Sequence, residues 1–186
     1  MFLFVGLGNK GTKYRDNRHN IGFLFIDYLV KKYNFLKINN KLKSIVYKGN
    51  ILDYNIILSK PETMMNLSGE SIRLIKNFYK IEQNNIFVFH DELDLNLGKI
   101  KFKFGGGSAG HNGIKNIDQN IGNKYYRIRI GVNNEDNKFS PDKFVLSDFK
   151  SEEKVLLNSK IELINYNIKY IFEKDINKFM NEINKQ

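Results

Sequence analysis

Residues 2–27 read FLFVGLGNKGTKYRDNRHNIGFLFID, and this stretch decides how the chain folds. It begins with a short apolar run, passes into a loop that contains three glycines, and ends in a helical pattern. From Ile21 onward the apolar residues recur at the spacing of an amphipathic helix, with Asn20 as its expected N-cap. A strand, a glycine-bearing loop and a helix in this order are typical of an α/β enzyme. His19 lies at the junction of loop and helix.

The rest of the chain continues this alternation. Strands are expected at 44–47, 52–59, 86–89, 100–104 and 125–132, and helices at 68–79, 114–121 and from 151 to the end. Gly49-Asn50 is the expected turn between the first two of these strands, and Pro61 ends the second. The order predicts one α/β domain over residues 1–186, with a twisted, mixed, mostly parallel sheet flanked by helices.

Composition limits the class of protein. The chain has 186 residues, 41% of them hydrophobic, and no cysteine, so we expect a globular domain without disulfides or thiolate chemistry. No apolar run is as long as a membrane span, and the start lacks the basic region of a signal peptide. We therefore expect a cytoplasmic protein without a membrane partner.

The formal net charge of +10 points to a polyanionic partner such as a nucleic acid. Lys101 and Lys103 alternate along one expected strand, and Arg127 and Arg129 along another, so the four can form one basic face. A solvated outer face is the alternative, and the heavy use of lysine throughout the chain is compatible with it.

Four polar clusters follow strands or lie in loops, at residues 6–20, 60–68, 90–94 and 105–112. The carboxyl ends of strands in an open α/β sheet face the ligand crevice, so these clusters are expected to meet there. They contain the three histidines of the chain and most of the candidate chemistry.

His19 is the candidate general base, because an imidazole can take a proton from water near neutral pH. The positive end of the helix dipole is expected to oppose its protonation. Asp91, expected just after a buried strand, can hold one ring nitrogen and stabilise the imidazolium. A capping histidine and a turn aspartate are the alternatives. Glu92 and Asp94 lack the spacing of a familiar ligand set, so no metal is expected.

The amides of Asn9, Asn66 and Asn112 can donate to a developing oxyanion, although asparagine is frequent in this chain. The run GGGSAG at 105–110 resembles an anion-binding nest but lacks the ending of a phosphate loop. The GxGxxG pattern at Gly6 has no helix directly after it, so it is weak support for dinucleotide binding. No cofactor is expected.

Taken together, the motifs resemble those of bacterial peptidyl-tRNA hydrolases. The matching pieces are VGLGNKGTKYRDNRHNIG, KPETMMNLSGES, HDELDLNLGKIKFKFGGGSAGHNGIKNI, RIRIGV and VLSDF, in the family's order and spacing. They span roughly four fifths of the chain. The resemblance implies a monomeric, metal-independent esterase, with tRNA carrying a peptide as its partner, that cleaves the ester between an N-blocked aminoacyl or peptidyl group and the terminal ribose.

The resemblance also implies roles for residues. His19 would activate water, Asp91 would stabilise His19, and Asn9 would help to distinguish blocked from free aminoacyl-tRNA. The residues implied to bind the peptide and the carbonyl are Asn66 and Asn112, those lining the pocket for the tRNA 3′ end are Tyr14, Met64 and Met65, and those clamping the tRNA 5′-phosphate are Lys103 and Arg129.

Some positions depart from the family pattern. Lys10 replaces a usual proline, which loosens the loop that carries Asn9, and Asn17 replaces a usual threonine or serine. Met64 takes a position that is frequently aromatic, Ser108-Ala109 varies the glycine run, and a proline-glycine pair after the strand at 127–132 is missing. None of these removes a catalytic group. An RNA-binding module without catalysis and a nucleotide-dependent enzyme remain the rival interpretations.

Overall fold

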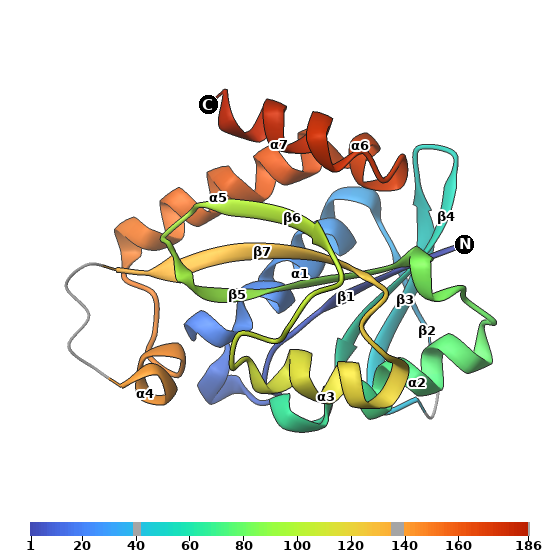
Figure 1. The fold of residues 1–186 in the computed structure, drawn as a ribbon, viewed down its shortest axis with the longest axis horizontal. Coiled ribbons are helices and arrows are strands. Elements are labelled where there is room, and N and C mark those ends of the chain that lie inside the picture. Colours follow the sequence, from blue (N-terminus) through green and yellow to red (C-terminus); the bar gives the residue numbers. More distant parts are fainter. Residues whose placement is uncertain (39–41, 135–139, 186) are drawn as a thin grey trace.

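The structure, a computed structural model, describes residues 1–38, 42–134 and 140–185 (Figure 1). In chain order the elements are β1 (Phe2–Gly6), η1 (Thr12–Tyr14), η2 (Arg18–Asn20), α1 (Ile21–Tyr33), β2 (Leu36–Ile38), β3 (Ser44–Ile51), β4 (Tyr54–Pro61), η3 (Met65–Leu67), α2 (Ser68–Phe78), η4 (Gln83–Asn85), β5 (Ile86–Asn96), β6 (Ile100–Phe104), α3 (Asn112–Ile121), β7 (Tyr126–Asn133), α4 (Pro141–Val145), α5 (Ser151–Tyr166), α6 (Ile168–Phe172) and α7 (Ile176–Asn184). Within these described residues, no helix is long and apolar enough to cross a membrane.

One seven-stranded sheet has the order β2-β3-β4-β1-β5-β7-β6. Its centre is parallel, because β1 pairs in parallel with β4 and β5, and β5 pairs in parallel with β7. Antiparallel strands extend both edges. The predicted mixed, mostly parallel sheet flanked by helices is confirmed.

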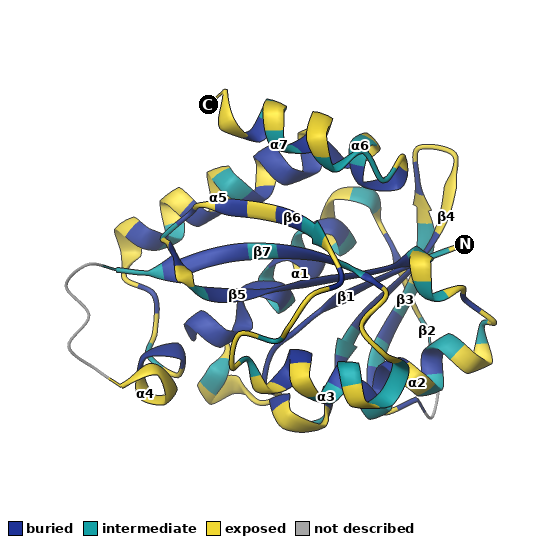
Figure 2. Cartoon of the chain, in the orientation of Figure 1, coloured by how far each residue is buried: buried dark blue, intermediate teal, exposed yellow. Residues whose placement is uncertain are grey.

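Successive side chains of β1 point to opposite faces of the sheet, so they contribute to two separate hydrophobic clusters. Phe4 packs in a cluster with residues of α1, α5, α6 and α7, whereas Leu3 and Val5 pack in a second cluster with residues of α2 and α3. The central strands are buried over most of their length (Figure 2). Helices therefore cover both faces, and polar side chains collect at the ends of the parallel strands.

The loop after β1 is fixed by an unusually close approach of α1. A Cβ atom on Gly22 would lie 2.3 Å from the Phe89 carbonyl oxygen and 2.4 Å from the Leu7 amide nitrogen. A Cβ atom on Gly6 would lie 2.1 Å from the Gly22 carbonyl oxygen. Because backbone fills this space, two glycines bring the start of α1 against β1 and β5.

The predicted turn between the two strands of the β3–β4 hairpin was wrong. The turn between β3 and β4 lies at Leu52-Asp53, not at Gly49-Asn50. Gly49 pairs with Ile56 inside the hairpin, and a Cβ atom there would meet the Phe35 ring at 2.8 Å. This glycine therefore makes room for an aromatic ring.

The strand expected at 86–89 continues to Asn96, so His90, Asp91 and Glu92 lie within β5. They pair with Arg129, Ile130 and Gly131 of β7, which supplies the backbone hydrogen bonds that polar residues at a strand end would lack. The helical C-terminal segment is divided into α5, α6 and α7. The polar sequence of residues 133–141 predicts a mobile segment, but residues 135–139 lie outside the described residues.

We predict that Gly22→Ala lowers the free energy of unfolding by about 1–3 kcal/mol, the usual cost of overpacking, despite the better helix propensity of alanine. Denaturant titration measures it. Gly107→Ala is the control, because a Cβ atom there meets nothing within 4 Å. Equal stability of both variants would show that α1 can move away from β1 without cost.

Candidate active site

The four polar clusters meet in a cleft beside the carboxyl ends of β1, β4 and β5. The cleft consists of two adjoining cavities of about 310 and 290 Å³. The residues that line both are His19, Asn112, Asp142 and Val145. The first cavity continues to Asp91 and His111, and the second to Asn9 and Asn66. His19 therefore lies where the two cavities join.

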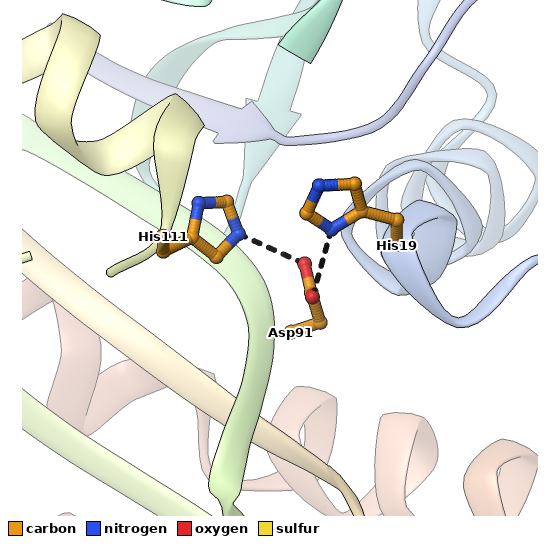
Figure 3. Close-up of side chains that lie close together, drawn as sticks. All are labelled: His19, Asp91 and His111. Carbon is orange, nitrogen blue, oxygen red and sulfur yellow. Dashed lines mark hydrogen bonds and ion pairs between the residues drawn. The ribbon is translucent and has the colours of Figure 1, made fainter. Parts of the chain in front are cut away.

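At the bottom of the cleft, the Asp91 carboxylate joins two imidazoles (Figure 3). His19 Nδ1 lies 2.8 Å from Asp91 Oδ2, and His111 Nε2 lies 2.9 Å from Asp91 Oδ1. The two rings are 5.0 Å apart between centroids. Asp91 is 2% exposed, so the carboxylate depends on these imidazoles for stabilisation.

The tautomer of His111 follows from its other contacts. Its Nδ1 accepts hydrogen bonds from the amides of Gly113 and Ile114 at 3.1 and 3.3 Å, which caps α3. Its proton is therefore on Nε2, which donates to Asp91. His111 thus adds a hydrogen bond to Asp91 while remaining uncharged, and the carboxylate charge is left to support an imidazolium at His19.

The pKa of His19 is raised above its ordinary value. Burial lowers this pKa, but the charge of Asp91 and its hydrogen bond to His19 outweigh burial, and the charge of Asp142 adds a smaller increase. Burial likewise opposes ionisation of Asp91, yet His19 and His111 hold the pKa of that carboxyl well below its usual range. Any opposition of the helix dipole to protonation of His19 is therefore outweighed. A full charge at 2.8 Å exceeds the partial charge of a helix end.

Asn20 occupies the predicted N-cap position of α1, but its side chain makes no capping hydrogen bond to the helix. Its Oδ1 accepts from the Asn9 amide at 2.8 Å, and its Nδ2 donates to the Asn9 carbonyl at 3.0 Å. The Asn9 side chain is fixed as well, because its Oδ1 accepts from the Met65 amide at 2.9 Å. This leaves Asn9 Nδ2 as the end that can donate to a ligand. The looser loop expected from Lys10 is offset by the contacts of Asn20.

The other residues predicted to bind substrate are placed unevenly. Met64, Met65, Asn66 and Asn112 line the second cavity, with Met65 buried and Met64 exposed. Tyr14 lines neither cavity, and its ring lies under the Lys13 ammonium at 4.7 Å.

The basic face is smaller than the sequence suggested. Arg127 is 2% exposed and donates to Asp118 and to the carbonyls of Gly106 and Gly107, so it holds the glycine-rich loop. Arg129 donates through Nε to Glu92 at 2.7 Å, which leaves its terminal nitrogens for other acceptors. Burial, followed by the charges of Arg129 and Arg127, lowers the pKa of Lys103. The positive charge that disfavours the protonated form of Lys103 would attract an anion such as a phosphate.

Among the described residues, His19, Asp91 and His111 are the one group whose potential metal-ligand atoms cluster, all within 4.8 Å of one another. The atoms that face one another are already joined by hydrogen bonds, with the carboxylate between the rings (Figure 3). The geometry is that of a hydrogen-bonded histidine–aspartate–histidine chain.

Comparison with known proteins agrees with the geometry. Residues 3–186 match the family model described as peptidyl-tRNA hydrolase. The chain belongs to the peptidyl-tRNA hydrolase family. A curated peptidyl-tRNA hydrolase from Rickettsia prowazekii is 43% identical over 98% of this chain and 100% of its own length, and one from Aliarcobacter butzleri is 46% identical over 92% and 90%. A crystal structure of peptidyl-tRNA hydrolase from Acinetobacter baumannii is 38% identical and superimposes with a TM-score of 0.91, covering 99% of this chain and 94% of that one.

The roles of two residues of the site were missed by sequence reasoning. His111 was included in the polar cluster at 105–112 without a role of its own, and Asn20 was expected only to cap a helix. His111 caps α3, but histidine is not among the residues preferred at the N-cap, so no capping rule singles it out. No local pattern indicates its contact with Asp91, 20 residues earlier in the chain.

We predict that the Asp91 carboxylate sets the protonation of His19. In wild type the imidazole should titrate above the ordinary value of about 6.5, and in Asp91→Asn below it, because burial then outweighs the smaller effect of the Asp142 charge. The measurement is NMR titration of the imidazole Cε1–H signals, with Asp94→Asn as a control that removes an exposed carboxylate from the same cavity. Identical midpoints for His19 in wild type and Asp91→Asn would contradict it.

Proposed function

We propose that the chain hydrolyses the ester between a peptide, or an N-blocked aminoacyl group, and the terminal ribose of tRNA, through attack by a water molecule that His19 deprotonates. The observation that supports this most directly is the contact of His19 Nδ1 with Asp91 in a cleft lined by amides. This contact leaves His19 Nε2 as the base.

The reaction then needs only groups of this chain. Water attacks the ester carbonyl carbon and gives its proton to His19 Nε2, and Asp91 stabilises the imidazolium. The developing oxyanion takes hydrogen bonds from amide donors, for which Asn9 Nδ2 and Asn112 are the candidates. Collapse of the intermediate breaks the bond to the ribose oxygen, which receives the proton from Nε2. The products are a free carboxylic acid and the tRNA hydroxyl.

Different residues are assigned to the peptidyl group, the tRNA 3′ end and the tRNA 5′-phosphate of the substrate. Asn66 and Asn112 bind the peptidyl group, and the residues assigned to the tRNA 3′ end are Tyr14, Met64 and Met65. Lys103 and Arg129 bind the tRNA 5′-phosphate, with Arg129 oriented by Glu92. Tyr14 lies outside both cavities, so its assignment rests on the sequence motif alone.

The proposal includes action as a monomer in the cytoplasm, without a metal or other cofactor. Light scattering tests the monomer, and activity retained after treatment with a chelator tests independence from a metal ion.

We predict that His19→Ala lowers kcat by about 10²–10⁴-fold, the usual contribution of a general base, and leaves tRNA affinity nearly unchanged. The measurement is release of N-acetyl-aminoacyl groups from tRNA, with binding of uncharged tRNA as the internal control. Near-normal turnover would remove His19 from the role of base. Binding by wild type without any ester cleavage would favour an RNA-binding module.

We predict that Lys103→Ala weakens tRNA binding and reduces the slope of log affinity against log salt by about 1, as loss of one phosphate contact should. Lys169→Ala is the matched control. This lysine lies on α6, which packs on the face of the sheet opposite to the one that Lys103 is on. An unchanged slope for Lys103→Ala would place the phosphate contact elsewhere.

A further inference from the structure

His19 is preceded by a buried arginine whose partner comes from the opposite end of the chain. Arg18 Nη2 lies 3.0 and 2.8 Å from the two carboxylate oxygens of Glu153, 135 residues later. Both side chains are 4% exposed. Arg18 lines neither cavity, so it cannot act on the substrate directly.

The surroundings of Arg18 hold the guanidinium in one orientation. Its centre lies 4.5 Å from the Phe144 ring and 5.0 Å from the Phe149 ring, and its Nε donates to Ser147 Oγ at 3.2 Å. Stacking on aromatic rings together with hydrogen bonds to a carboxylate is a task for the planar guanidinium, which a lysine does not replace.

Glu153 joins several segments at once. Its Oε2 also accepts from the Lys150 amide at 2.8 Å, which caps α5, and its Oε1 accepts from Asn134 Nδ2 at 3.2 Å. Burial alone would raise the pKa of Glu153, but these hydrogen bonds, led by those of Arg18, lower it. The carboxylate is therefore charged and fully engaged.

The backbone around Arg18 is attached to the same region. The Arg18 amide donates to the Ser147 carbonyl at 3.0 Å, and the Phe149 amide donates to the Asp16 carbonyl at 3.0 Å. Asn17 Nδ2 donates to Asp148 at 2.6 Å. Val145, which lines both cavities together with His19, lies just before this attachment. These contacts and the Arg18–Glu153 pair thus join the segment that carries His19 to the segment that follows Val145.

Each of the three residues of η2 contacts a different part of the structure around the base. Consecutive side chains of a 3₁₀ turn point about 120° apart, so they meet three different neighbours. Arg18 meets Glu153, His19 meets Asp91, and Asn20 meets the Asn9 backbone. Because the three residues share one short backbone turn, the orientation of Arg18 is coupled to that of His19.

We propose that the buried Arg18–Glu153 pair is a positioning element for the general base: it fixes η2 so that His19 meets Asp91 on one side and the substrate on the other. This inference rests on the proposed function for its effect on turnover, although its effect on His19 itself does not. A pair that only stabilised the fold would change the melting temperature and leave the state of His19 unchanged.

The test compares Glu153→Gln with Lys154→Ala. Lys154 and Asp16 form an ion pair at 3.0 Å that joins the same two segments, but both side chains are exposed. Glu153→Gln should lower kcat about 10–100-fold, as a small misplacement of a reacting group does, with KM within about twofold. Lys154→Ala should leave both within about twofold of wild type.

The second readout is the NMR titration of His19, whose charged neighbours are Asp91 and Asp142. In Glu153→Gln the midpoint should fall, because the contact with Asp91 loosens, whereas in Lys154→Ala it should not move. This readout needs no tRNA, so it distinguishes failure of the positioning role from failure of the proposed esterase activity.

The double variant Arg18→Met/Glu153→Met keeps the test decisive if Glu153→Gln does not fold, because a buried ion pair can often be replaced by apolar side chains without loss of stability. It should fold, yet show the lower kcat and the lower His19 midpoint. A folded variant with wild-type turnover and a wild-type His19 midpoint would overturn the proposal and leave the pair a structural one.

Discussion

The site depends on one buried carboxylate. Asp91 is almost inaccessible to solvent, and an isolated charge in that position would be strongly unfavourable. Two imidazoles reduce this cost in different ways. His111 donates a hydrogen bond without a charge, because the amides at the start of α3 occupy its other nitrogen. His19 is therefore the partner that can become an imidazolium, and only its Nε2 is left for a substrate or water.

This arrangement requires several chain segments at fixed positions. Asp91 lies inside β5, His111 ends the glycine-rich loop, and His19 follows the loop after β1. The two glycines at the contact of α1 with β1 bring η2 near β5, and Arg127 ties the glycine-rich loop to β7 through carbonyl oxygens. The carboxyl ends of parallel strands supply the location, but close backbone packing supplies the distances.

Sequence patterns predicted the fold because the spacing of apolar residues and the order of strands and helices can be read locally along the chain. The apolar runs at β1 and β5 and the helical spacing in α1 were sufficient to place a mostly parallel sheet. The same patterns misplaced the end of β5, since polar residues usually end a buried strand. Here His90, Asp91 and Glu92 remain in the ladder because β7 pairs with their backbone, while Asp91 and Glu92 find charged or hydrogen-bonding partners in His19, His111 and Arg129.

For the site, sequence reasoning selected His19, Asp91 and Asn9, which the structure brings into one cleft. It could not predict the contacts of His111, Asn20 and Arg18. Each of these depends on where a distant segment passes, at separations of 20, 11 and 135 residues from its partner. The direction of the pKa shift at His19 also depends on such a contact, with Asp91, so the helix dipole alone could not predict it.

The basic face shows why counting charges overstates a binding surface. Lys101, Lys103, Arg127 and Arg129 alternate along two neighbouring strands, yet Arg127 is buried against Asp118 and two carbonyls, and Arg129 gives one nitrogen to Glu92. Burial and the two neighbouring arginines disfavour the charged form of Lys103. An arriving phosphate would relieve that repulsion at Lys103, whereas it would gain little at Arg127. The partners already present in the fold therefore exclude Arg127 from binding a phosphate, and they leave the terminal nitrogens of Arg129 available to the proposed clamp with Lys103.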